Sequence, residues 1–189
     1  MSSESTNSLR TEGFIYLIAF TLCIPAANWM IGNVGTVCPP DSPCLLPVGF
    51  GLMAPSGVLL VGLALVLRDL VQRRLGKLWA VIAILIGAGI SYWLAPPALV
   101  VASTVAFLLS ELADFAVYTP LQERRLVLAV LLSSFVGLVI DSVVFLYLAF
   151  GSLDFVAGQI VGKLWMVLLA LPLIWLLRES DNRRGVVPA

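Results

Sequence analysis

The sequence predicts an all-α, polytopic membrane protein with six transmembrane helices and with both termini in the cytoplasm. Of its 189 residues, 60% are hydrophobic and only 12% are charged, whereas soluble domains have about 45–50% apolar and about 25% charged residues. Six long apolar segments alternate with short polar connections. Among the connections and tails, Lys and Arg fall on one side only, which is the charge bias of membrane proteins.

Each apolar segment is long enough to cross a bilayer, for which a helix needs about 20 mostly apolar residues. The predicted spans are residues 13–32, 48–68, 78–95, 97–118, 127–150 and 157–177. The Gly and Pro residues of GFGLMAPSG predict an irregular or kinked second span. Together the spans form one transmembrane domain over 13–177, between a cytoplasmic N-terminal tail, 1–12, and a cytoplasmic C-terminal tail, 178–189.

The distribution of basic residues predicts the orientation. With six spans, the two tails and the connections 68–77 and 119–125 lie on the same side of the membrane. Their basic residues are Arg10, Arg68, Arg73, Arg74, Lys77, Arg124, Arg125, Arg178, Arg183 and Arg184. The three opposite connections contain neither Lys nor Arg. The basic side is therefore assigned to the cytoplasm.

Composition also excludes several functions. The net charge is zero, so no basic surface favours nucleic-acid binding. The chain has no His, which excludes histidine-based metal sites and histidine general bases. In the first outer connection, Cys38 and Cys44 flank PPDSP and could form a disulfide in an oxidising periplasm, or remain two free thiols.

Two carboxylates interrupt the fourth predicted span. A charge at the centre of a membrane helix costs roughly 2.5–3.5 kcal/mol on insertion scales, so such a residue marks a binding site, a relay or an ion pair. Glu111 and Asp114 are three residues apart and share one helix face. Glu111 is the deeper of the two and the first candidate for ligand contact. Asp69, at the end of the second span, is either an interfacial acid paired with Arg or a gate or coupling residue.

A second polar group is predicted in the outer half of the membrane. Asp141 lies about 9 residues, or ~13 Å, from the outer end of its span, and Lys163 lies ~9–12 Å into the next span. The two side chains can therefore form an ion pair, with either a functional or a purely structural role. Gln159 shares the helix face of Lys163, and Asn28 lies at a similar depth. Either amide alone could simply join helices.

Several motifs together resemble the VUT, or queuosine precursor transporter, family of six-helix membrane proteins over residues 14–177. The motifs are AANWMIG, APSGVLLVGLALVLRDLVQRRLGK, LLSELADFAVYTPLQERR, SSFVGLVIDSVVFLYLAF and QIVGKLWMVLLALPL. They place the family's polar residues at Asn28, Asp69, Glu111, Asp114, Asp141 and Lys163. The chain departs from longer members in its short loops and in having Leu138 where some members have Asn.

The resemblance implies import of a 7-deazaguanine, preQ0 or preQ1, across the bacterial inner membrane for tRNA queuosine synthesis. It implies no cofactor, and its partners are this small molecule and the lipid bilayer, with homo-oligomerisation left open. A carboxylate can accept two neighbouring donors of a base edge in a bidentate contact, a role that suits Glu111. Asn28 or Gln159 could donate to the base carbonyl, and an aromatic ring could stack on the base.

Three other classes of membrane protein are alternatives to this one. The substrate-binding subunit of an energy-coupling-factor vitamin importer has similar size and helix number, but it needs an ATPase module as partner. An integral-membrane enzyme is disfavoured because there is no nucleophile elbow and no paired-acid metal motif. A non-transporting assembly protein would not need acids and a base spread over four helices.

Overall fold

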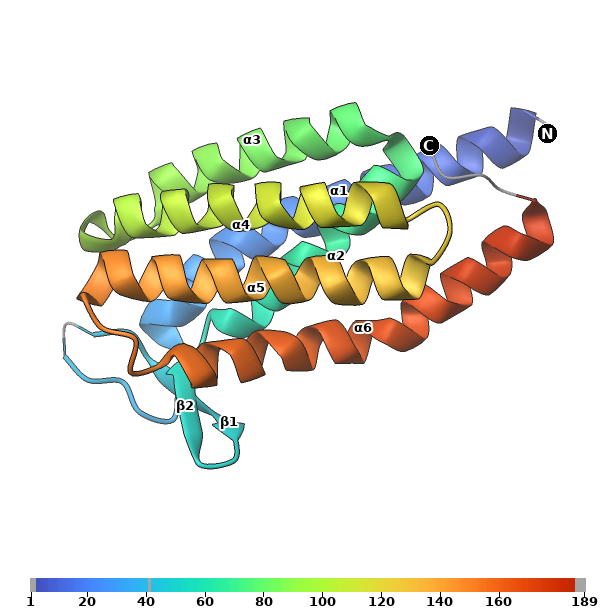
Figure 1. Ribbon diagram of the computed structural model, residues 1–189. Coiled ribbons are helices and arrows are strands. Elements are labelled where there is room, and N and C mark those ends of the chain that lie inside the picture. The colour runs from blue at the N-terminus through green and yellow to red at the C-terminus, as the bar shows by residue number, and fades with distance from the viewer. Residues whose placement is uncertain (1–2, 41, 186–189) are drawn as a thin grey trace.

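The computed structural model describes residues 3–40 and 42–185, and this part of the chain is a helical bundle with one β-hairpin (Figure 1). Its elements are α1 (Ser3–Asn33), β1 (Leu45–Gly49), β2 (Leu52–Pro55), α2 (Val58–Leu75), α3 (Lys77–Leu94), the 3-10 turn η1 (Pro97–Leu99), α4 (Val100–Leu121), α5 (Leu126–Phe150) and α6 (Val156–Arg184). The helices alternate in direction, so α1 begins and α6 ends at the same end of the bundle. We call this the termini end and the opposite one the hairpin end.

The all-α membrane class predicted from the sequence is confirmed, but six spans are not. Among the described residues, five helical segments are long and apolar enough to cross a membrane, with mean hydropathies of 1.7 to 2.4. They lie on α1, α3, α4 with η1, α5 and α6. The helix α2 is not among them, because its 18 residues include Arg68, Asp69, Arg73 and Arg74.

The second predicted span, 48–68, is misplaced at both ends. Its first residues form the antiparallel β1–β2 hairpin, in which Leu45 pairs with Pro55. Gly49 and Gly51 at the hairpin tip have φ of 101° and 72°, values that only Gly adopts readily. The helix then runs through the predicted connection RDLVQRR and stops at Gly76, which has φ of 92°. Arg68 and Asp69 are therefore inside the helix and fully buried, instead of at a membrane boundary.

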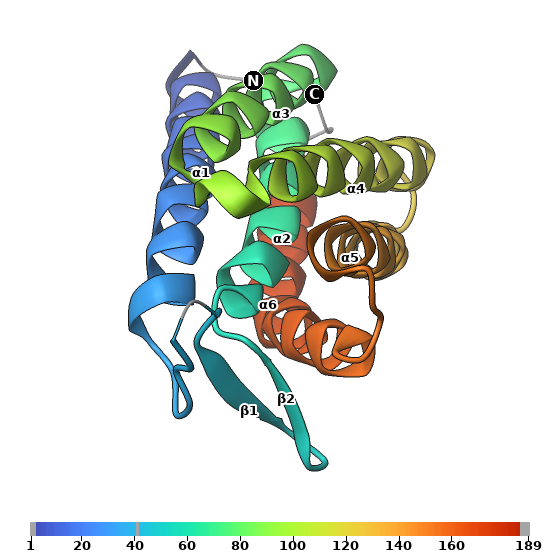
Figure 2. The same cartoon turned by 90° about the vertical axis from the view of Figure 1, so that its left-hand side faces the viewer.

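The central place of α2 explains why it tolerates these charges. Figure 2 shows α2 surrounded by the other five helices, and α2 contacts each of them. Thirteen of its 18 residues are buried, whereas the apolar windows of the other helices are only 22–39% buried. The outer helices thus present apolar side chains to lipid. The polar groups of α2 meet protein partners, as a charged side chain at membrane depth must.

Glycines bring α6 and α4 close to their neighbours. A Cβ atom at Gly62 of α2 would collide with the backbone of Lys163 on α6. A Cβ atom at Gly137 of α5 would lie 3.1 Å from Cβ of Asp114 on α4. These two close approaches help to fix the depth and direction of the Lys163 and Asp114 side chains.

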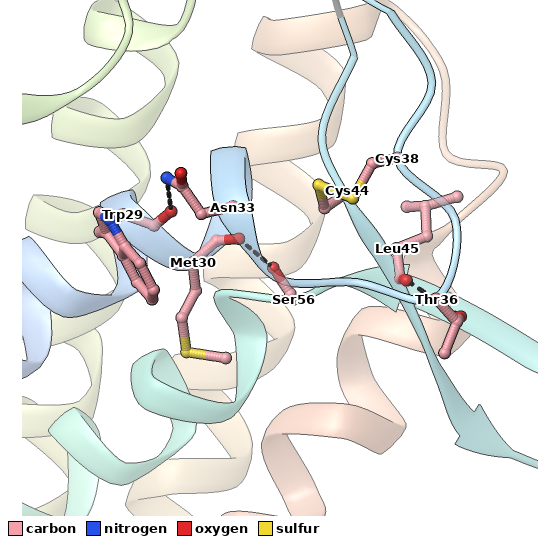
Figure 3. Close-up of a disulfide and its surroundings, with 8 residues drawn as sticks. All are labelled: Trp29, Met30, Asn33, Thr36, Cys38, Cys44, Leu45 and Ser56. Atoms are coloured by element: carbon pink, nitrogen blue, oxygen red, sulfur yellow. Dashed lines mark hydrogen bonds between the residues drawn. A yellow bond between two sulfur atoms is a disulfide. The ribbon is translucent and has the colours of Figure 1, made fainter.

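The hairpin is anchored to the bundle from two sides. Cys38 and Cys44 form a disulfide with an S–S distance of 2.01 Å (Figure 3). The Ser56 hydroxyl donates to the Met30 carbonyl at 2.7 Å, and the Trp165 indole donates to the Val48 carbonyl at 2.8 Å. The hairpin therefore sits over α1 and α6 as a fixed part of the hairpin end.

The two predicted tails continue the helices where the structure describes them. The helix α1 begins at Ser3 and α6 ends at Arg184, so 3–12 and 178–184 are helical. Residues 1–2 and 186–189 of those tails lie outside the described residues.

Candidate substrate pocket and buried charge cluster

A pocket lies inside the bundle, with lining residues from α1, α2, α3, α4, α5 and α6. The volume open to the centre of a water molecule is about 90 Å³, and one water needs about 10–15 Å³ on this measure. The pocket thus has room for several waters. Its polar lining residues are Asn28, Ser91, Ser103, Ser110, Glu111, Asp141, Gln159 and Lys163, and its aromatic ones are Phe107 and Phe145.

Lys163 of α6 organises one wall of the pocket. Its ammonium group donates to Asp141 Oδ2 at 2.6 Å, to Gln159 Oε1 at 2.6 Å and to Ser142 Oγ at 2.8 Å. Because an ammonium group has three N–H donors, these contacts satisfy it completely. The ion pair expected between Asp141 and Lys163 is therefore present. Lys163 is 1% exposed, so its charge depends on this local set of acceptors.

Glu111 of α4 connects the pocket with a second group of charges. It lines the pocket, and its Oε2 accepts a hydrogen bond from Arg68 Nε at 3.0 Å. Among the described residues, the hydrogen bond of Glu111 to Arg68 involves Oε2 and leaves its other oxygen, Oε1, outside that contact. Glu111 thus has one oxygen engaged behind the pocket wall and one available to a ligand.

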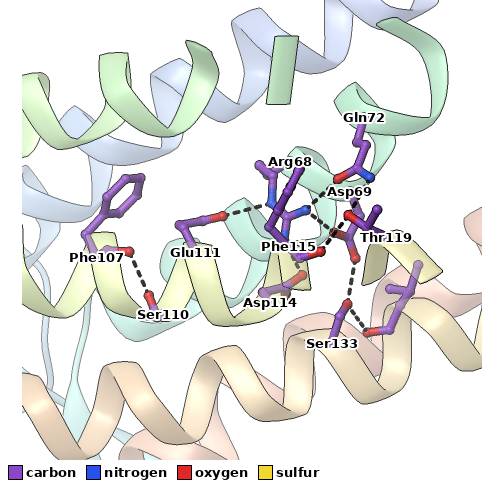
Figure 4. A network of polar contacts seen from close by, with 11 residues as sticks. Arg68, Asp69, Gln72, Phe107, Ser110, Glu111, Asp114, Phe115, Thr119 and Ser133 are labelled. Carbon is purple, nitrogen blue, oxygen red and sulfur yellow. Dashed lines mark hydrogen bonds and ion pairs between the residues drawn. The ribbon is translucent and has the colours of Figure 1, made fainter. Parts of the chain in front are cut away.

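Behind Glu111, Arg68 holds together a buried charge cluster (Figure 4). Its Nη1 lies 2.8 Å from Asp69 Oδ1, and its Nη2 donates to Asp114 Oδ1. Its Nη1 also donates to Gln72 Oε1 at 3.3 Å. We call Arg68, Asp69, Glu111 and Asp114 the Arg68 cluster; all four are 0–1% exposed. The planar fork of a guanidinium suits such multiple carboxylate contacts, which a Lys could not reproduce.

Other side chains complete the surroundings of the Arg68 cluster. The Ser133 hydroxyl of α5 donates to Asp69 Oδ2 at 3.0 Å. The rings of Phe115 and Tyr118 on α4 each lie with their centroids 5.9 Å from the guanidinium carbon of Arg68, within cation–π range.

A further set of ion pairs closes the termini end. Arg73 Nη2 lies 2.6 Å from Asp181 Oδ2, and Arg74 Nη1 lies 2.8 Å from Asp181 Oδ1. Arg74 Nε also lies 2.9 Å from Glu12 Oε2. These bonds tie α2 to both α1 and α6. These ion pairs involve residues that we assign from the sequence to the polar tails and to the connection 68–77.

The structure brings together five of the six predicted substrate-binding residues. Asn28, Glu111, Asp141, Gln159 and Lys163 all line the pocket. The sixth residue, Asp114, does not line it and belongs to the Arg68 cluster. Asp69, predicted as a gate or coupling residue, lies in that cluster too.

Sequence reasoning missed Arg68 as a site residue and assigned it to a cytoplasmic connection. One signal could have found it. The stretch from 58 to 75 contains no Pro, its single Gly is Gly62, and the next helix-ending residue is Gly76. If the helix continues to Gly76, Arg68 lies within a helix of the bundle and not in a connection between two spans.

A bundle of apolar helices around an internal pocket of charged and amide groups is typical of multi-pass membrane transporters. Residues 92–177, which include α4, α5 and most of α6, match the family model described as "Putative vitamin uptake transporter". This match confirms the resemblance to the VUT family over that part of the chain and indicates a membrane transporter of the vitamin-uptake type. The comparisons with curated proteins and with solved structures gave no match.

Proposed function

We propose that the protein imports a queuosine precursor, preQ0 or preQ1, across the bacterial inner membrane and that the precursor binds in the internal pocket. The observation that carries the proposal is the convergence of Glu111, Asp141, Gln159, Lys163 and Asn28 on this one pocket. The motifs that resemble the VUT family supply the substrate class, and the family match over 92–177 supports a transporter.

The pocket chemistry suits a deazaguanine. The ring N–H and the exocyclic amine are neighbouring donors, and Glu111 offers an acceptor oxygen to them. The oxygen of Gln159 already accepts from Lys163, which leaves its NH₂ group as a donor for the base carbonyl. Phe107 and Phe145 line the same space and can pack on the flat ring.

The position of the pocket suits transport by alternating access. Its lining reaches the hairpin end through Ile31, Pro55 and Gly57. Towards the termini end, the Arg68 cluster follows one helical turn after the pocket on α2, and the pairs of Arg73 and Arg74 with Asp181 follow beyond it. These ion pairs form a closed side that must open to release substrate. The orientation predicted from Lys and Arg makes this side cytoplasmic.

Genetic rescue tests the proposal. A bacterium that lacks both precursor synthesis and its own transporter should regain queuosine in tRNA when it expresses this chain and receives preQ0 or preQ1 at low concentration. Glu111→Gln should abolish rescue, because Gln keeps an acceptor for Arg68 but replaces the second acceptor oxygen with a donor. Asp154→Asn, on the exposed connection before α6, is the matched control and should rescue fully. Failure with every precursor would contradict the proposal.

The vitamin-importer alternative makes a different prediction about partners. A substrate-binding subunit of an energy-coupling-factor importer needs an ATPase module for uptake. Purified chain in liposomes without any ATPase should therefore take up precursor if our proposal holds. Binding without uptake would favour the alternative.

A further inference from the structure

Asp69 on α2 and Asp114 on α4 both contact the guanidinium of Arg68 through their Oδ1 atoms. Both residues are 0% exposed. Asp114 Oδ2 is buried and has no hydrogen-bond partner among the described residues, although the oxygens of an ionised carboxylate need donors. Two carboxyl groups that share a buried site favour a state with one proton between them, because each negative charge disfavours the other. We call these two residues the Asp69–Asp114 pair.

The neighbouring positive charge does not remove the need for this proton. Arg68 is shared among Asp69, Asp114 and Glu111, so one guanidinium faces three carboxyl groups. It donates a hydrogen bond to Asp114 Oδ1, and its Nη1 lies 2.8 Å from Asp69 Oδ1 as an ion-pair contact. Of the remaining oxygens, Asp69 Oδ2 accepts from the Ser133 hydroxyl, whereas Asp114 Oδ2 has no hydrogen-bond partner in the described part of the chain.

No other charged group of the described chain faces the pair without a partner. On α2, Arg73 is held by Asp181. On α4, Tyr118 contributes a neutral phenol. From α5 the pair meets Ser133 and the backbone near Gly137. On α6, Lys163 is satisfied by Asp141, Gln159 and Ser142.

We propose that the Asp69–Asp114 pair is a proton-binding site that couples substrate uptake to the proton gradient. The inference rests on the proposed transport function. The pair takes up one proton from the hairpin side and carries a single negative charge, and it releases that proton on the termini side. Arg68 is the link to substrate, because the same guanidinium bonds the pair and Glu111, which lines the pocket. Loss of the proton strengthens the pull of the pair on Arg68 and weakens the Arg68–Glu111 bond.

Infrared difference spectroscopy tests the site without any substrate. The purified wild-type protein should show the C=O band of a protonated carboxyl that shifts in D₂O and disappears at high pH. Asp69→Asn should remove this band. The Asn amide has N–H donors of its own, so Asp114 stays ionised and no protonated carboxyl group remains in the pair. Asp154→Asn should keep it. A band that survives both Asp69→Asn and Asp114→Asn would overturn the proposal.

Transport assays in liposomes test the coupling. Wild-type protein should accumulate precursor when the outside is acidified, and Asp69→Asn should lose this accumulation while it still exchanges labelled for unlabelled precursor. Exchange survives because the uncharged amide of Asn beside an ionised Asp114 gives the same total charge as the pair with one proton bound. Gradient-driven accumulation by Asp69→Asn at the wild-type level would overturn the proposal, as would wild-type uptake that ignores the proton gradient. If wild type neither exchanges nor accumulates any precursor, the proposed function fails, and the infrared result alone then decides on the proton site.

Discussion

Lys163 and Arg68 are both buried cations, but their surroundings differ in charge balance. Lys163 has one acid, Asp141, and its other two acceptors are the neutral Gln159 and Ser142. Arg68 faces three acids and is fully enclosed by protein. We call Lys163, Asp141, Gln159 and Ser142 the Lys163 group. Its one positive and one negative charge balance, so it can serve as a stable wall of the pocket. The Arg68 cluster has an excess of acid, which makes it sensitive to protons and to whatever binds Glu111.

The largest expected effect comes from removing the cation of the Arg68 cluster. Arg68→Gln should destabilise the fold by about 3–5 kcal/mol, because it leaves buried carboxyl groups without their partner. Thermal unfolding in detergent measures the loss, and the exposed Arg124→Gln is the matched control. Stability of Arg68→Gln equal to that of the control would show that the cluster does not hold the bundle together.

Removing the cation of the Lys163 group should reduce the stability of the fold less than removing Arg68. Lys163→Gln should cost about 2 kcal/mol, since the side chain of Asp141 is 12% exposed and lines the pocket, where water can solvate it. Adding Asp141→Asn should restore much of the stability, because the double variant has no unpaired charge. Precursor uptake by the double variant should remain lost. If it transported like wild type, the pair would be structural only.

A smaller effect is expected where α2 touches α6. Gly62→Ala should destabilise by about 1–3 kcal/mol, because the new methyl group collides with the Lys163 backbone. Thermal unfolding again measures it. Gly89→Ala in α3 is the control, since its Cβ would meet open space, and it should be neutral or slightly stabilising. Equal behaviour of the two variants would contradict the close approach of α2 and α6.

The smallest effect concerns the edge of the Arg68 cluster. Ser133→Ala removes one hydrogen bond to Asp69 and should cost about 1 kcal/mol. The matched substitution Ser142→Ala removes a bond to Lys163 and should cost about as much. In the infrared experiment, only Ser133→Ala should shift the protonated-carboxyl band. A shift caused by Ser142→Ala would contradict the separation of the two groups.

Helix position was largely predictable from the sequence, because apolar length and turn residues are local signals. The predicted spans 78–95 and 127–150 correspond to α3 at Lys77–Leu94 and α5 at Leu126–Phe150. The Asp141–Lys163 pair was also predictable, because adjacent antiparallel helices place equal depths side by side. The candidate pocket residues were predictable because a polar or charged side chain inside a membrane helix costs free energy and therefore marks a functional site or an ion pair.

The burial of the charged residues on α2 was not predictable in the same way. These charges looked like a membrane boundary because the partners of Arg68 lie on α4, 43 and 46 residues away in the chain. No local pattern shows that such partners exist. The hairpin was missed for a related reason: an apolar stretch with Gly and Pro can form a kinked helix or a pair of strands, and the disulfide and the contacts with α1 and α6 favour the strands.

Uptake by the purified chain alone tests the central claim most directly, that the pocket beside Glu111 is the substrate site of a transporter. Liposomes containing wild-type protein should take up labelled preQ0 or preQ1 without an ATPase, and an excess of the unlabelled precursor should abolish the signal. Glu111→Gln should lose this uptake while its thermal unfolding stays near that of wild type. Wild-type uptake that persists undiminished in folded Glu111→Gln would contradict the account.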